Sequence, residues 1–148
     1  MVNFWTMAQP ENYIFSWHKN TVRSISWLEN EIGFVSADQN FTIAVWLMPR
    51  VQSGGAPNVP VWHYNCKQVN FTSMFAYKLP RDKDKDKDVN TIRISVIATG
   101  TDNFIHEICE GKLVTKYELG STAHQIHVMA GKKALFCGIN QANKPGTV

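Results

Sequence analysis

The chain has 148 residues, of which 44% are hydrophobic and 18% are charged, a balance typical of a folded domain rather than a disordered segment. Its net charge of +3 is small, and no lysine and arginine stripe is interleaved with aromatic residues, which excludes an obvious nucleic-acid partner. No apolar run approaches the roughly 20 residues of a membrane-spanning helix, and the first residues lack a signal-peptide pattern, so no membrane element is predicted.

The hydrophobic pattern predicts an all-β chain without a helix of useful length. Short runs rich in β-branched and aromatic residues alternate with turn residues. In chain order, strands are expected at residues 2–7, 13–17, 21–27, 32–36, 42–46, 61–68, 71–77, 92–98, 104–109, 113–119, 124–130 and 134–139. Two segments are predicted to be exposed loops: residues 49–60, which hold proline and a Gly-Gly pair, and residues 81–88, RDKDKDKD, which hold no apolar residue.

The most regular stretch, residues 18–46, places polar side chains where its three strands join. His18 precedes the first strand, Ser36 ends the second, Asn40 lies in the next turn and Trp46 ends the third. A buried indole N–H needs an acceptor, a hydroxyl both accepts and donates, and an imidazole extends the chain of hydrogen bonds. We therefore predict a buried network of these four residues that fixes the register of the strands.

This layout resembles one WD40 repeat, the sequence unit of a β-propeller blade. In that family a histidine, a serine or threonine, an aspartate and a tryptophan at these places form the buried network. Ser36 and Trp46 match the family by spacing, whereas Asn40 stands where the family usually has aspartate and Leu47 replaces the aspartate after the tryptophan. Asp38 is close by, but its spacing from Trp46 differs from that of the family.

The resemblance implies WD40-type blades in an incomplete propeller of about three blades, repeating at roughly 40–45 residues. The expected divisions are the end of a preceding blade (1–11), a blade with its following loop (12–60), a blade with the charged insertion (61–111) and a partial blade (112–148). The outer strand of the first blade is expected at residues 13–17. Because propellers typically have four to eight blades, we expect the chain to be a portion of a longer polypeptide or to complete its propeller with other chains.

In the second repeat, two replacements are expected to remove the polar network. Ala98 stands in the place of the serine and Ile108 in that of the tryptophan, although Asp102 has the turn position. Apolar packing is therefore expected to stabilise this repeat.

Candidate catalytic and metal-binding groups are few. The sequence lacks the GxSxG, Walker A and HExxH motifs. His63 and Cys66 are three residues apart, as are His124 and His127, and this spacing places each pair on opposite faces of a strand. His106 is interpreted as a surface or half-buried residue. We predict no enzyme, no metal site and no cofactor.

The pattern of the three cysteines predicts reduced thiols. Cys66, Cys109 and Cys137 form no Cys-x-x-Cys pair and are odd in number, so we interpret them as reduced core thiols of an intracellular protein.

The second repeat, ISVIATGTDNFIHEI followed by GKLVTKYEL, and the third, ending in ALFCGINQANKPGTV, are similar to repeats of ciliary WD proteins. These are axonemal WD-repeat coiled-coil scaffolds of the cilia- and flagella-associated protein fifty-seven type. The resemblance implies a cytoskeletal protein of the ciliary axoneme that helps position inner dynein arms and regulate beating. The implied partners are inner dynein arm or tether components and the doublet microtubule.

Two other functions stay open at this point. One is a non-ciliary intracellular WD40 adaptor in the cytoplasm. The other is a small hydrolase or metal protein on a β-fold.

The charged loop generates a first prediction. Replacing residues 81–88 with a short Gly/Asn turn is expected to change the free energy of unfolding by no more than about 0.5 kcal/mol, because solvated surface segments contribute little. Urea denaturation of both chains measures the difference. A loss well above this value would show that the loop packs against the protein.

Overall fold

The computed structural model describes residues 2–5, 12–28, 32–47, 59–80, 92–121, 123–128 and 135–139. Within these ranges the chain is all-β, as predicted, and no helix long and apolar enough to cross a membrane is found. Both predicted loops, apart from residues 59 and 60, lie outside the described residues. The strands are β1 (Val2–Trp5), β2 (Asn12–Phe15), β3 (Val22–Trp27), β4 (Gly33–Asp38), β5 (Thr42–Leu47), β6 (Trp62–Asn65), β7 (Phe71–Lys78), β8 (Ile94–Gly100), β9 (Phe104–Cys109), β10 (Lys112–Glu118), β11 (Ala123–Val128) and β12 (Leu135–Ile139).

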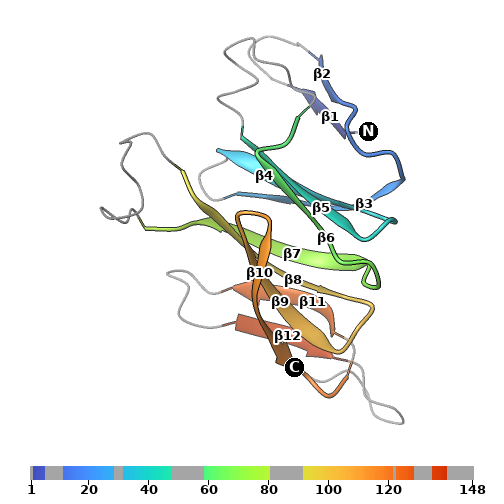
Figure 1. Cartoon of the computed structure of the whole chain (residues 1–148), viewed down its shortest axis with the longest axis vertical. Coiled ribbons are helices and arrows are strands. Elements are labelled where there is room, and N and C mark those ends of the chain that lie inside the picture. The colour runs from blue at the N-terminus through green and yellow to red at the C-terminus, as the bar shows by residue number, and fades with distance from the viewer. Residues whose placement is uncertain are drawn as a thin grey trace.

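These strands form two four-stranded sheets and two hairpins. The first sheet has the order β3-β4-β5-β6 and the second has the order β7-β8-β9-β10, with every neighbouring pair antiparallel. Strands β1 and β2 form the N-terminal hairpin, and β11 and β12 form the C-terminal hairpin. Figure 1 shows these four units arranged in chain order along the longest axis of the molecule.

The outer strand of the first sheet differs from the prediction. Strand β2, which overlaps the expected outer strand (residues 13–17) at residues 13–15, pairs with β1, and the fourth strand of the first sheet is β6. Likewise, β10 belongs to the second sheet rather than to the following unit. The physical reason is that an antiparallel strand adds to the nearest free edge, and β6 returns along the free edge of β5. Each sheet is therefore displaced by one strand from the predicted sequence divisions.

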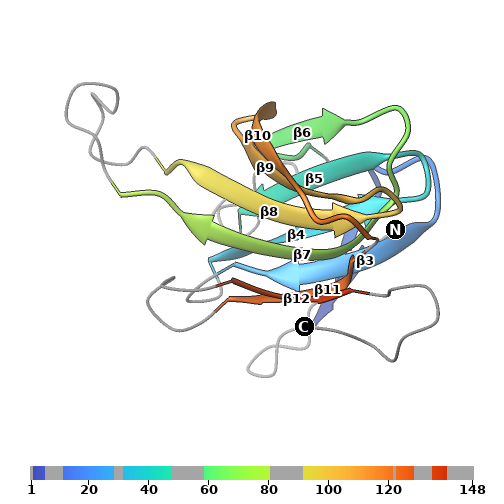
Figure 2. The ribbon, with the colours of Figure 1, turned by 90° about the horizontal axis from the view of Figure 1, so that it is seen from below.

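The main core lies between the two sheets. Val35, Ile43 and Val45 of the first sheet and Val96 and Ile108 of the second are each 0% exposed and belong to one hydrophobic cluster. Strand β3 lies against β7, and Leu28 forms an isolated parallel bridge with Ala76. Figure 2 shows the outer strands β6 and β10 together on one side of the molecule and β3, β7 and β11 toward the other.

The central strand β4 is buried on both faces, including its polar residues Ser36 and Asp38. Every residue of β4 is buried, whereas the edge strand β3 alternates between half-buried and exposed residues. A strand with a covered layer on each side has no solvent-exposed face, so its burial does not alternate along the sequence as it does in a half-exposed strand.

One close backbone approach accounts for a glycine at the end of β8. A Cβ atom on Gly100 would lie 2.1 Å from the backbone oxygen of Asn70, which also accepts a hydrogen bond of 3.1 Å from the backbone N–H of Thr101. Only glycine allows this segment, which leads into β7, to lie against the end of β8.

Gly100→Ala is therefore expected to lower the free energy of unfolding by about 1–3 kcal/mol, because the backbone of residue 70 must move to admit the methyl group. Thermal and urea unfolding measure the loss. Thr72→Ala, at an exposed position of β7, is the control and is expected to stay within about 0.5 kcal/mol of the parent chain. Equal stability of the two variants would contradict the close approach.

Candidate functional site

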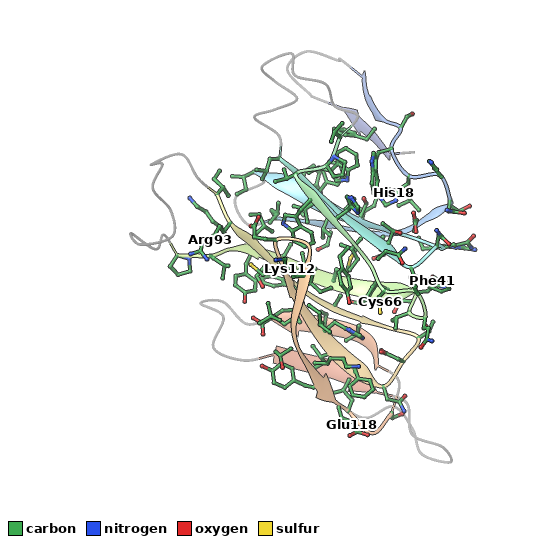
Figure 3. The ribbon with its side chains drawn as sticks, viewed as in Figure 1. His18, Phe41, Cys66, Arg93, Lys112 and Glu118 are labelled. Carbon is green, nitrogen blue, oxygen red and sulfur yellow. The ribbon has the colours of Figure 1, made fainter. Side chains whose placement is uncertain are left out.

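Four side chains of the first sheet and its entry segment form one chain of hydrogen bonds. The Nδ1 atom of His18 lies 2.7 Å from Oδ2 of Asp38, and its Nε2 atom lies 2.7 Å from Oγ of Ser36. The indole Nε1–H of Trp46 donates to the same Ser36 oxygen over 3.0 Å. In Figure 3, His18 lies on the segment that joins β2 to β3, beside the first sheet.

The register of β4 and β5 brings two members of this chain to one face. Phe34 pairs with Trp46 and Ser36 pairs with Ala44, so all four side chains project from the same face of the sheet. The methyl group of Ala44 is small, which leaves room for the Trp46 indole to reach diagonally across to Ser36.

The partners of His18 determine how its protons are placed. A carboxylate only accepts, so Nδ1 carries a proton that it donates to Asp38, and in the neutral ring Nε2 accepts from the Ser36 hydroxyl. The side chains of His18 and Asp38 are 1% and 4% exposed, and Ser36 is 0% exposed. Because every member has a partner, the network satisfies polar groups that water does not reach.

The structure brings together three of the four predicted residues, His18, Ser36 and Trp46, and replaces Asn40 by Asp38. The other carboxylate oxygen of Asp38 accepts from the backbone N–H of Asn40 over 2.8 Å and from that of Thr42 over 3.2 Å. The backbone oxygen of Asn40 accepts from the hydroxyl of Thr42 over 3.1 Å. Asn40 therefore contributes its main chain to the turn, and its side chain makes no bond to His18.

This correction has a local physical cause. Asp38 is the last residue of β4, and its side chain folds over the following turn, where Phe41 adopts a left-handed φ of 63°. Aspartate commonly accepts a hydrogen bond from the backbone two residues later. That preference, together with the charge of the carboxylate, is the sequence signal that identifies Asp38, whereas counting residues back from Trp46 selects position 40.

Aromatic rings cover the network. Phe15, from the N-terminal hairpin, makes edge contacts with Phe34 and Trp46 at ring-centroid distances of 5.1 Å each. Trp17 lies beside both Trp46, at 6.4 Å, and His63, at 5.1 Å. The strength of hydrogen bonds rises in such a low-dielectric environment, so the rings and the polar chain stabilise the same arrangement.

The second sheet has a shorter polar pair in place of this network. His106 is 2% exposed and its Nε2 atom lies 2.7 Å from Oδ2 of Asp102, so its interpretation as a surface or half-buried residue is wrong. Ala98 lies opposite His106, and Ile108, 0% exposed, has the place that Trp46 has in the first sheet. Apolar packing thus replaces the serine and tryptophan, as expected, while a histidine–aspartate pair within one hairpin remains.

Each polar cluster borders a surface depression. The first has a volume of about 350 Å³ and is lined by Ser16, Trp17, His18, Lys19, Asn20, Asp38, Asn40 and Thr42. The second has a volume of about 360 Å³ and is lined by Cys66, Lys67, Gln68, Val69, Asp102, Phe104, His106 and Lys116. Across the described residues, no group of three histidine, cysteine or acidic side chains is placed to hold a metal ion.

The cysteines are less buried than predicted. Cys66 and Cys109 are half-buried, and neither is in a disulfide bond. Burial, and secondarily the neighbouring Cys66 thiol, raises the pKa of Tyr64 above its ordinary value. The side chain of Cys137 lies outside the described residues.

The order Asp38–His18–Ser36 has the atomic connections of a hydrolase triad. A nucleophilic serine must, however, reach a substrate carbonyl. Ser36 is 0% exposed and its oxygen already accepts the Trp46 N–H, so no carbonyl carbon can approach it in this arrangement. The geometry is that of a structural network.

Comparison with known proteins adds no family to this picture. No family model and no curated protein matches the sequence.

Ser36→Ala is expected to lower the free energy of unfolding by about 1–3 kcal/mol, because it leaves the Trp46 N–H and His18 Nε2 buried without a partner. Asn40→Ala, whose side chain is exposed, is the matched control and is expected to change stability by no more than about 0.5 kcal/mol. Urea denaturation followed by tryptophan fluorescence measures both. A larger effect at Asn40 than at Ser36 would contradict the observed network.

Proposed function

We propose that the chain forms consecutive blades of a WD40-type β-propeller and acts as a non-enzymatic scaffold for protein interactions. The observation that carries this proposal is the Asp38–His18–Ser36–Trp46 network, which has the residue types of the family network joined in one chain. The two four-stranded antiparallel sheets support the same proposal, because β3 lies against β7 and β7 lies against β11 of the C-terminal hairpin.

The position of the network favours a structural role over catalysis. Ser36 is 0% exposed, and the depression beside the network is lined by His18 and Asp38 but not by Ser36. In propellers, binding functions usually lie in loops and at rims, because the sheets supply a rigid frame that holds those loops.

A continuous rim is the described surface best placed to bind a partner. The backbone N–H of Cys66 donates to the oxygen of Phe41 over 2.9 Å, which joins the segment before β7 to the β4–β5 turn. The N–H of Thr101 donates to the oxygen of Asn70, which joins the same segment to the β8–β9 turn. His18, Phe41 and Cys66 lie along one edge in Figure 3, whereas Arg93 lies at the opposite edge.

The proposed cellular role is an axonemal scaffold that helps position inner dynein arms and regulate ciliary beating. Its support is the resemblance of two stretches, ISVIATGTDNFIHEI and ALFCGINQANKPGTV, to repeat motifs of ciliary WD proteins. The proposed neighbours are components of the inner dynein arms or their tethers and the doublet microtubule, held by the rim over a surface of about 1,200–2,000 Å².

Gene deletion with localisation of a tagged copy tests this role. The tagged protein is expected in cilia and on doublet microtubules after salt extraction, and deletion is expected to alter beating without removing cilia. Normal beating together with a tagged protein outside cilia would overturn the axonemal role and favour the intracellular adaptor.

A charge reversal tests the rim. Lys67→Glu changes an exposed residue of the rim and is expected to reduce co-sedimentation with salt-stripped doublets by about tenfold, as for loss of a favourable interfacial charge contact. Lys78→Glu, exposed at the other end of β7, is the matched control and is expected to bind like the parent chain. Equal binding by both variants would place the contact elsewhere.

A further inference from the structure

One half of a face of the first sheet is left open. Ile25 pairs with Ser36 and Trp27 with Phe34, so both residues of β3 share the face that carries Trp46. Phe15 of the N-terminal hairpin covers the part of this face formed by Phe34 and Trp46. Ile25 and Trp27 remain 51% and 49% exposed, which makes the inner-strand half an apolar surface open to solvent.

The second sheet shows the opposite pattern. Strand β11 lies against β7 and β8, and the backbone N–H of Ile126 donates to Oγ of Ser73 over 3.1 Å. Tyr117 of the outer strand β10 shares this face with Ser73, because the register connects them through Ile105 and Thr99. Tyr117 is 55% exposed, so here the inner half is covered and the outer half is open.

The two hairpins are complementary halves of one sheet. Strand β2 leads into β3 as β6 leads into β7, so β1 and β2 correspond to the third and fourth strands of a complete sheet. Strands β11 and β12 follow β10 and correspond to the first and second. Second and third strands pair antiparallel in both complete sheets, and among the described strands β1 and β12 each have one neighbour only.

We propose that a second copy of this chain completes both halves. Its C-terminal hairpin lies on Ile25 and Trp27, its β12 pairs with β1, and the N-terminal hairpin thereby covers the second copy's Tyr117. The contact repeats a packing that the chain already shows, in which β3 lies against β7 and β7 against β11.

This head-to-tail contact can close on itself. The described strands of each copy form two four-stranded sheets and two hairpins, so those of two copies make about six sheets, within the four to eight that propellers typically have. A heterologous contact whose rotation closes gives a ring rather than a filament. The inference rests on the sheet geometry and, for ring closure, on the proposed propeller; it does not depend on the axonemal role.

Sedimentation equilibrium and light scattering of the 148-residue chain test the contact. The parent chain is expected at twice the monomer mass of 16.8 kDa. Ile25→Lys and Tyr117→Lys, one on each open half, are each expected to raise the dimer dissociation constant at least about tenfold, as for burial of an unpaired charge. Val59→Lys, at a residue 62% exposed outside both halves, is the control and is expected to leave the dimer unchanged.

Mixing the two variants distinguishes a head-to-tail contact from other association. A mixed dimer of Ile25→Lys and Tyr117→Lys copies keeps one contact with both surfaces intact. At a concentration where each variant alone is monomeric, equimolar mixing is therefore expected to restore dimers. Circular dichroism of each variant checks that it is folded. A monomeric parent chain, variants that dimerise like the parent, or a mixture of folded variants without dimers would overturn the proposal.

Discussion

The structure depends on the burial of one indole N–H. Trp46 is held against aromatic rings, and its N–H donates to Ser36, whose hydroxyl in turn bonds to the imidazole of His18. His18 in turn requires the carboxylate of Asp38. Because these residues come from an entry segment and two strands, satisfying one polar atom sets the register of β4 and β5 and the position of the preceding chain. Phe15 and Trp17 are carried into the core by the same constraint.

The strands were predictable from the sequence, but their partners were not. Strand positions follow from local patterns of β-branched and aromatic residues, and β9 was predicted with its observed ends at Phe104 and Cys109. Strand pairing depends on which sheet edge is free when the chain folds back. The residues of β2 and β6 do not specify which edge each strand will join. Likewise, the sequence of β4 predicts a strand, but it does not say which layers bury both faces of that strand.

The site shows the same division between local and non-local information. Ser36 and Trp46 were predictable because their spacing fits one hairpin and their chemistry is complementary. The choice between Asp38 and Asn40 depended on the direction of a side chain over a turn, which the left-handed Phe41 controls. The burial of His106 depends on the layer packed over it, which the local sequence does not specify, so its bond to Asp102, four residues away, was not predictable.

The displacement of the sheets by one strand from the sequence divisions bears on how such a chain can grow. When a gene segment encoding one division is duplicated, the new copy brings three strands of its own sheet together with the outer strand of its neighbour. The inserted outer strand fills the edge that the insertion would otherwise expose, as β6 fills the edge of β5. Tandem duplication therefore adds sheets to the chain without creating an unprotected sheet edge. The hydrogen bonds between the outer strand and its neighbour connect the original segment to the new one.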